Sequence, residues 1–181
     1  MGKIIAIVNQ KGGVGKTTSC INLAASMALL EQKTLLIDLD PQANATTGSL
    51  FQKEPGANIA QVLLDEIPIQ ESLLVTPAGY SLIPGTTDLT QTEVQLLQKE
   101  QREYTLKKKL AVLSNVYDYI LLDCPPSLNI LTVNALVAAN SVIIPVQCEY
   151  FALEGLSNLI NTLQSLRATV NPHLQIHGIL R

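Results

Sequence analysis

The 181-residue chain is 47% hydrophobic and 15% charged, with a formal net charge of −3 and a pI near 5.3. This length fits one compact domain spanning residues 1–181, and the acidic balance argues against a strongly basic nucleic-acid-binding face within these residues. No apolar run reaches the ~18 residues that a membrane span requires, and the first residues already read as a strand rather than a signal peptide. We therefore expect a cytoplasmic protein that does not contact a membrane.

Six short apolar runs predict strands at residues 3–8, 34–39, 80–83, 118–122, 141–146 and 175–180. They are apolar throughout instead of alternating with polar residues, which is typical of strands covered on both faces of a parallel sheet. Helical patterns separate them, such as the Ala- and Leu-rich residues 17–30 and the leucine stripe of residues 156–166. This order predicts an α/β fold with a doubly wound, mostly parallel sheet and helices on both faces. The last run reads as the middle of a buried strand, so we expect a C-terminal part of the domain to be missing.

A glycine-rich loop follows the first predicted strand, in the sequence IVNQKGGVGKTTSC at residues 7–20. Its glycines allow backbone N–H groups to converge on phosphate oxygens, and the next helix adds its positive N-terminal end. Gly15, Lys16 and Thr17 match the end of the ATP- and GTP-binding pattern G-x-x-x-x-G-K-[ST], whose first glycine is Gln10 here. We expect Lys16 to reach the β- and γ-phosphates of a nucleotide and the Thr17 hydroxyl to bind Mg²⁺.

Carboxylates stand at the ends of two other predicted strands. In YDYILLDCPP, Asp123 ends an apolar strand and the two prolines lead the chain out of the sheet, so we expect Asp123 to hold Mg²⁺ through water. Asp38 and Asp40 leave the second strand, and strand alternation predicts that they point to the same side. One of them could orient an attacking water while another holds the water shell of the metal. For Asp38, a metal-shell role and a structural role both stay open.

Other residues with reactive side chains are interpreted as structural. Three cysteines without C-x-x-C spacing favour buried thiols over a disulfide or a zinc site, at Cys20, Cys124 and Cys148. His173 and His177 have no third ligand near them in the sequence. The one basic cluster, residues 107–109, is interpreted as a solvated helix face.

Four segments resemble one known family. QKGGVGKTT resembles the deviant Walker A motif of the ParA/MinD superfamily, K-G-G-x-x-K-[ST] with an added signature lysine, which is Lys11 here. DLDPQANAT, DCPPSLNILTVNAL and PVQCEYFALEGLSNL resemble the ParA/Soj branch, the ATPases that segregate chromosomes and plasmids. The likeness extends over almost the whole chain, and the four segments occur in the same order as in the family.

The resemblance implies a nucleotide site and a mode of action. ATP would bind at Lys11, Gly12, Gly13, Val14, Gly15, Lys16, Thr17 and Thr18, with Thr18 at the α-phosphate. Two subunits would close face to face around two ATP molecules, and Lys11 of each subunit would reach the phosphates held by the other. Such a cation neutralises charge on the transferred phosphoryl group, as an arginine finger does.

The resemblance also implies individual roles. By this resemblance Asp40 would position the hydrolytic water and Asp123 would hold Mg²⁺ through water. Together with the phosphate-loop motif and the strand pattern above, the candidate catalytic residues are Lys11, Lys16 and Asp40, and the candidate Mg²⁺ residues are Thr17, Asp123 and Asp38. The segment through Ser127 and Asn129 would act as a switch that senses the γ-phosphate.

The implied partners belong to DNA partitioning. The ATP-bound homodimer would bind DNA without sequence preference, through the C-terminal part expected to be missing, and would associate with the nucleoid. A ParB-like centromere-binding protein would stimulate hydrolysis.

Three alternatives compete with this interpretation. A MinD-like membrane-cycling regulator of division-site placement fits DLDPQANAT less well. A nitrogenase-iron-protein-like electron carrier would need a second cysteine near residue 90 as a partner for Cys124. A non-hydrolysing interaction protein would use nucleotide only to select its partner.

Overall fold

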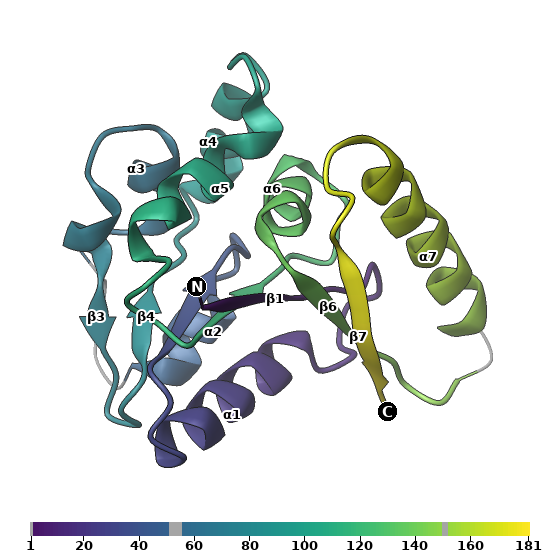
Figure 1. The fold of residues 1–181 in the computed structure, drawn as a ribbon, viewed down its shortest axis with the longest axis horizontal. Helices are drawn as coiled ribbons and strands as arrows, with labels where there is room; N and C mark the ends of the chain where they lie inside the picture. The colour runs from purple at the N-terminus through teal and green to yellow at the C-terminus, as the bar shows by residue number, and fades with distance from the viewer. Residues whose placement is uncertain (1, 51–55, 150–151) are drawn as a thin grey trace.

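The computed structural model describes residues 2–50, 56–149 and 152–181, and these residues contain one mixed sheet in the order β3-β4-β2-β5-β1-β6-β7 (Figure 1). Every neighbouring pair is parallel except β3 and β4, which are antiparallel. The strands are β1 (Lys3–Ile7), β2 (Thr34–Asp38), β3 (Leu74–Val75), β4 (Ser81–Ile83), β5 (Tyr119–Asp123), β6 (Ser141–Pro145) and β7 (Gln175–Leu180). The predicted doubly wound, mostly parallel sheet is therefore confirmed, and β3 is an addition that the sequence pattern did not predict.

Helices cover both faces of this sheet. The α-helices are α1 (Lys16–Leu29), α2 (Asn44–Ser49), α3 (Ile59–Leu63), α4 (Leu89–Leu96), α5 (Thr105–Leu110), α6 (Ile130–Ala138) and α7 (Ala152–Thr169). Short 3₁₀ segments stand at Ile69–Ser72, Arg102–Tyr104 and Ala111–Leu113. One core cluster packs α1 and α2 against one face, and a larger cluster packs α3 to α7 against the other (Figure 1).

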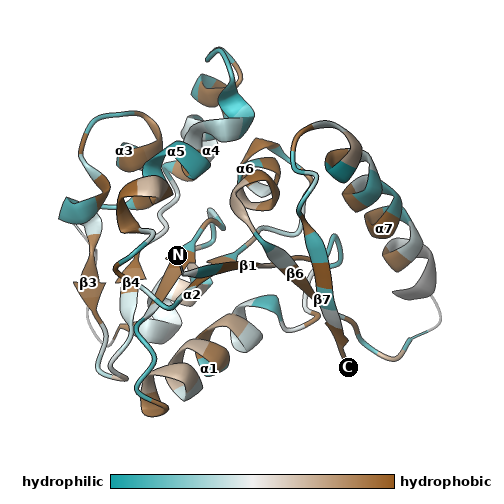
Figure 2. Ribbon diagram, in the orientation of Figure 1, coloured by the Kyte–Doolittle hydropathy of each residue, from teal (hydrophilic) through white to brown (hydrophobic). Residues whose placement is uncertain are grey.

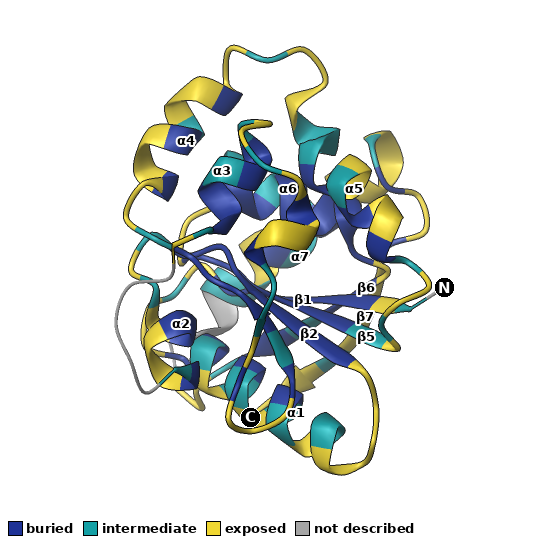
Figure 3. Ribbon diagram, turned by 90° about the vertical axis from the view of Figure 1, so that its left-hand side faces the viewer, coloured by how far each residue is buried: buried dark blue, intermediate teal, exposed yellow. Residues whose placement is uncertain are grey.

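Burial on both faces explains why the strands are apolar at successive positions. All five residues of β2 are buried, and β1 and β5 are buried at every position after the first (Figure 3). Side chains of a strand alternate between faces, so a strand with a helical layer on each side buries all of them. The centre of the layer that holds α3 to α7 is α6, which is hydrophobic over most of its surface (Figure 2).

The last strand differs from the expectation of burial. β7 pairs with β6 and forms an edge of the sheet, and its side chains are mostly exposed. Ile176, Ile179 and Leu180 are 44%, 50% and 48% exposed. Its apolar composition predicted a strand correctly, but the described residues leave its side chains mostly uncovered. Among the described residues, no helix has the length and apolar character needed to cross a membrane.

Candidate nucleotide-binding site

Strand register places the predicted site residues side by side. Asp123 at the end of β5 pairs with Ile7 at the end of β1 and with Asp38 at the end of β2. The glycine-rich loop begins where β1 ends, so it starts next to both carboxylates. In open α/β sheets, ligands bind in the crevice at the carboxyl ends of the strands, and this edge is the corresponding place here.

The loop has the backbone that its glycines predict. Gly13 and Gly15 have φ values of +73° and +92°, in the left-handed region that favours glycine, and Gly15 caps the N-terminus of α1. A Cβ atom at Gly12, Gly13 or Gly15 would meet no heavy atom within 4 Å, so there is open space beside the loop at all three positions. The N-terminus of α1 faces this space and favours an anion there.

A cavity of about 460 Å³ opens over this loop. The loop and α1 contribute Gly12, Gly13, Gly15, Lys16, Thr17 and Thr18, and other segments contribute Asp40, Gln42, Asn44 and Pro126. Lys11 and Val14 do not line it. Sequence reasoning had not identified Gln42 and Asn44, although both stand in the DLDPQANAT segment that follows β2.

Lys16 places an ammonium group at the base of the loop. Its side chain is largely buried, and Nζ donates a hydrogen bond to the carbonyl oxygen of Lys11, 3.1 Å away. Burial lowers the pKa of Lys16, and the nearby carboxylates of Asp123 and Asp40 oppose that shift. A buried ammonium group whose hydrogen bond goes to a carbonyl oxygen can donate to a phosphate oxygen instead.

Asp123 has a buried oxygen that the protein does not satisfy. The residue is 0% exposed, and the Cys20 thiol donates to Oδ1 at 3.5 Å, whereas Oδ2 is buried with no hydrogen-bond partner among the described residues. Burial and repulsion from Asp38 raise the pKa of Asp123 to about 7, and the nearby hydroxyl of Thr17 and thiol of Cys20 oppose this rise. An unsatisfied buried carboxylate oxygen is costly, and a hydrated divalent cation would satisfy it. The residues present therefore fit Mg²⁺.

Asp38 is also 0% exposed, but both of its oxygens are occupied. Oδ2 accepts hydrogen bonds from the Thr46 backbone N–H at 2.8 Å and the Thr46 hydroxyl at 2.7 Å, and Oδ1 accepts one from the Asp40 N–H at 3.1 Å. Burial raises its pKa to about 6, and the Thr46 hydrogen bonds counteract this. Of the two roles left open for Asp38, these contacts favour the structural one, which fixes the segment between β2 and α2.

Asp40 lines the cavity, but it lies two residues after the end of β2 and not within the strand. β2 ends at Asp38, so the alternation that predicted a common side for Asp38 and Asp40 does not extend to Asp40. Its Oδ1 accepts a hydrogen bond from the Gln42 N–H at 2.9 Å, and its carbonyl accepts one from Ala43. Ala43 is left-handed with φ +51°, which turns the chain into α2. The turn, rather than the strand, directs Asp40 toward the loop.

Lys11 does not line the cavity and contacts another segment instead. Its Nζ forms an ion pair with Glu149, and its side chain is 41% exposed. Gln147, two residues before Glu149, donates from Nε2 to the carbonyl oxygen of Gly13 at 3.0 Å. Sequence reasoning had identified neither Gln147 nor Glu149, and the available signal was their position just after an apolar strand.

The predicted switch segment contacts the cavity mainly through Pro126. Asn129 caps α6, since its Oδ1 accepts a hydrogen bond from the Thr132 N–H at 3.1 Å, and its Nδ2 donates to Glu93 of α4. The Thr132 hydroxyl donates to the carbonyl of Ser127 at 2.7 Å. Ser127 and Asn129 thus shape the turn between β5 and α6.

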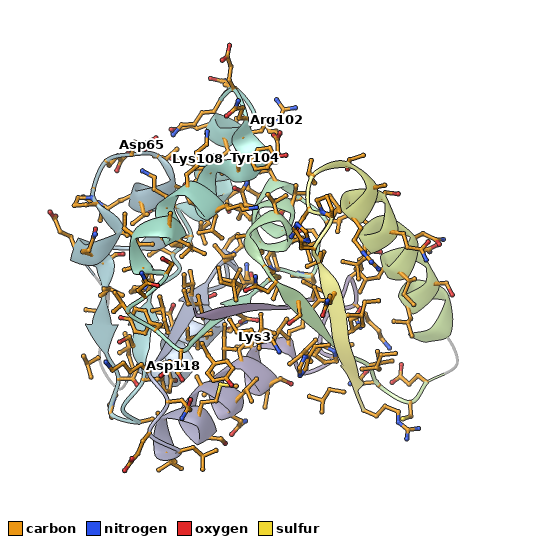
Figure 4. All side chains as sticks on the ribbon, viewed as in Figure 1. Lys3, Asp65, Arg102, Tyr104, Lys108 and Asp118 are labelled. Carbon is orange, nitrogen blue, oxygen red and sulfur yellow. The ribbon has the colours of Figure 1, made fainter. Side chains whose placement is uncertain are left out.

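Two expectations about other side chains are corrected or refined. Cys20 and Cys124 are buried as expected, but Cys148 is exposed, because it lies in the segment after β6 rather than in the strand. The basic cluster on α5 is only partly solvated, because Lys109 forms an ion pair with Asp65. Figure 4 labels Asp65 and Lys108, the neighbour of Lys109 in this cluster. No group of three or more His, Cys, Asp and Glu residues within the described residues forms a metal cluster.

A glycine-rich strand-to-helix loop, a buried lysine at its end and an unsatisfied aspartate on the neighbouring strand define this protein as a P-loop NTPase. Residues 2–176 match a family model described as an AAA domain. The chain is 52% identical over 182 residues to the chromosome partitioning protein ParA of Myxococcus xanthus, covering 99% of this chain and 64% of that protein. It is 47% identical over 185 residues to the sporulation initiation inhibitor protein Soj of Bacillus subtilis, covering 99% of this chain and 72% of Soj.

Solved structures agree with these relatives. A plasmid partition protein from Borrelia burgdorferi superposes with a TM-score of 0.88 at 33% identity, over 99% of this chain and 79% of that one. A protein from Mycobacterium smegmatis described as cobyrinic acid a,c-diamide synthase, crystallised with ADP and magnesium, superposes with a TM-score of 0.95 at 38% identity, over 99% of this chain and 74% of that one. The chain belongs to the ParA/Soj family of partition ATPases.

Proposed function

We propose that this protein is a Mg²⁺-dependent ATPase that hydrolyses ATP to ADP and phosphate and drives the partitioning of chromosomal or plasmid DNA. The observation that carries the proposal is that buried Lys16 and buried Asp123, whose Oδ2 has no partner among the described residues, both stand beside an open glycine loop. Similar proteins crystallised with ADP or an ATP analogue together with magnesium support the choice of ligands. Residues 1–181 would form a single domain.

The phosphate loop would bind and orient the triphosphate. Backbone N–H groups of residues 12–18 would donate to phosphate oxygens, and Lys16 would exchange its contact with the Lys11 carbonyl for one with a phosphate. Bound Mg²⁺ supplies positive charge that neutralises the β- and γ-phosphate oxygens. Thr17 and Asp123 would hold the Mg²⁺ ion, Asp123 through water. Asp38 would act indirectly, by fixing the segment that carries Asp40.

Asp40 would orient the attacking water. It is the carboxylate that lines the cavity, and the Gln42 N–H holds it through Oδ1, which leaves Oδ2 to accept a hydrogen bond from water. Lys11 of a second subunit would complete the site by contributing a cation to the phosphates. Contributions of this kind are worth roughly 10³–10⁵ in rate.

The proposed cellular setting follows the family. The ATP-bound homodimer would bind nucleoid DNA in the cytoplasm without sequence preference and would release it after hydrolysis stimulated by a ParB-like centromere-binding protein. No membrane partner is proposed.

ATP turnover tests the proposal. The protein should hydrolyse ATP slowly alone and faster when DNA and the ParB-like partner are both present, and Asp40→Ala should form the ATP-bound dimer without turnover. Glu71→Ala, which removes an exposed carboxylate outside the cavity, is the control and should match the wild type. Absence of stimulated turnover would favour the non-hydrolysing interaction protein, and normal turnover by Asp40→Ala would refute the role of Asp40.

A further inference from the structure

The segment that follows β6 lies against the phosphate loop. β6 pairs in parallel with β1, with Ile7 opposite Ile143, so the chain leaves both strands at the same edge of the sheet. We call residues 146–149 the β6 strap. Asn9 fixes its start by donating from Nδ2 to the Pro145 carbonyl at 2.6 Å, within the buried part of the loop.

Two side chains of the β6 strap contact the loop directly. Gln147 donates from Nε2 to the carbonyl of Gly13 at 3.0 Å, and Glu149 forms an ion pair with Nζ of Lys11. The Glu149 carboxylate is thus the group that determines where the Lys11 ammonium points. The pair is half-exposed, with side-chain exposures of 41% for Lys11 and 56% for Glu149, so water and salt weaken it.

Lys11 is held at its backbone as well as at its ammonium group. Its N–H donates to Oδ1 of Asn9 at 3.0 Å, and its carbonyl accepts the hydrogen bond from Lys16 at 3.1 Å. The backbone contacts lie within the loop, whereas the ion pair with Glu149 joins residues 138 positions apart. Loss of Glu149 would therefore release the Lys11 side chain without changing the contacts that hold its backbone.

We propose that Glu149 is a positioning residue that holds Lys11 against its own chain and competes with the nucleotide of a second subunit for that ammonium group. This inference rests on the proposed function, in which Lys11 acts on the phosphates held by its partner. One ammonium group cannot point at Glu149 and across the subunit interface at once. Dimerisation must therefore break two such ion pairs, one in each subunit, and each pair shifts the equilibrium toward the monomer.

The size of this effect follows from the exposure of the pair. Exposed ion pairs of this kind change an equilibrium by about 1.4- to 5-fold each, so two pairs would change the dimer dissociation constant by about 2- to 30-fold. The triphosphate of the partner carries more negative charge than a single carboxylate and can therefore displace Glu149. The β6 strap would weaken dimerisation without preventing it.

Glu149→Gln tests the inference, because it keeps the shape of the side chain and removes its charge. Glu71→Gln removes an exposed carboxylate away from the loop and is the matched control, and Glu149→Asp keeps the charge as the conservative variant. The first measurement needs no nucleotide: an amine-acetylating reagent labels the protein, and mass spectrometry compares the labelling rate of Lys11 with that of exposed Lys107 as an internal reference. The second measures dimerisation by light scattering with a slowly hydrolysed ATP analogue at low and high salt.

We expect Glu149→Gln to label Lys11 about 1.4- to 5-fold faster and to dimerise about 2- to 30-fold more tightly than the wild type at low salt. The difference should shrink at high salt, and Glu149→Asp should stay closer to the wild type than Glu149→Gln. Equal or weaker dimerisation of Glu149→Gln, or unchanged labelling of Lys11, would overturn the inference. If the wild type itself does not dimerise with the analogue, the proposed function fails, while the labelling still decides whether Glu149 holds Lys11.

Discussion

Replacing Asp123 with Asn should change how the stability of the nucleotide-free protein depends on pH. Asp123 is 0% exposed, and burial with repulsion from Asp38 raises its pKa from 3.8 to about 7. A shift of about three pKa units corresponds to about 4 kcal/mol of free energy between the two protonation states. In the wild type this cost of ionisation is absent below pH 4, where the carboxyl is protonated in both the folded and the unfolded chain.

The sign of the effect follows from proton binding. Between pH 4 and pH 7 the unfolded chain releases the proton of Asp123 while the folded chain keeps it, so the free energy of unfolding falls as pH rises. Above pH 7 the folded chain also releases it and the loss is complete. About 2–3 kcal/mol of the loss should therefore lie between pH 5 and pH 8. The amide of Asp123→Asn does not titrate, so this variant should lack this part of the pH-dependent loss of stability.

The free energy of unfolding at pH 5 and at pH 8 is measured by urea denaturation, followed by circular dichroism. The samples contain EDTA and no nucleotide. Comparing each protein with itself cancels any fixed cost of burying the amide that replaces the carboxyl group. The wild type should lose about 2–3 kcal/mol more than Asp123→Asn between pH 5 and pH 8, and Glu71→Gln should behave as the wild type. Equal pH dependence in the wild type and Asp123→Asn would refute the reasoning.

Three other substitutions test separate parts of the site. Lys16→Ala should weaken ATP binding by about 10- to 100-fold in isothermal titration calorimetry, because a charge-assisted hydrogen bond contributes about 1.5–3 kcal/mol; unchanged affinity would contradict the role of Lys16. Lys11→Ala should bind a slowly hydrolysed ATP analogue but remain a monomer in light scattering. If this variant dimerised as well as the wild type, Lys11 would not act across the interface. Gly85→Ala should lower the free energy of unfolding by about 1–3 kcal/mol, the usual effect of overpacking. Its new Cβ would meet the Asp38 carbonyl oxygen at 2.7 Å, whereas Gly56→Ala, where nothing lies within 4 Å, serves as the control for the urea measurement.

The strands were predictable because most of them are buried on both faces. Each of the six predicted runs overlaps an observed strand, and for the five other than β7 the continuous apolar sequence is the result of a helical layer on either side. β3 was missed because it has two residues, Leu74 and Val75, of which Val75 is 79% exposed, and so short a segment carries no periodicity. The exposure of β7 depends on the order of strands in the sheet, which the sequence of a single strand does not encode.

The site was predictable where its chemistry is local. The positive φ values of Gly13 and Gly15 and the place of Lys16 at the start of α1 follow from a run of consecutive residues. Contacts between distant segments were not predictable, because no periodic pattern connects them. The ion pair of Lys11 joins it to a residue 138 positions away, and the hydrogen bond from Asn9 to Pro145 spans 136 positions.

The two buried carboxylates at the end of the sheet show how identical residues in matched positions acquire different roles. Asp38 and Asp123 are opposite each other in neighbouring parallel strands, and both are 0% exposed. Asp38 accepts three hydrogen bonds from Thr46 and Asp40, which stabilise its charged form, and its pKa rises only to about 6. Asp123 keeps one oxygen without a partner among the described residues, and its pKa rises to about 7. A cation bound at this edge would therefore gain most from Asp123, while the oxygens of Asp38 accept hydrogen bonds from the segment that leads to α2.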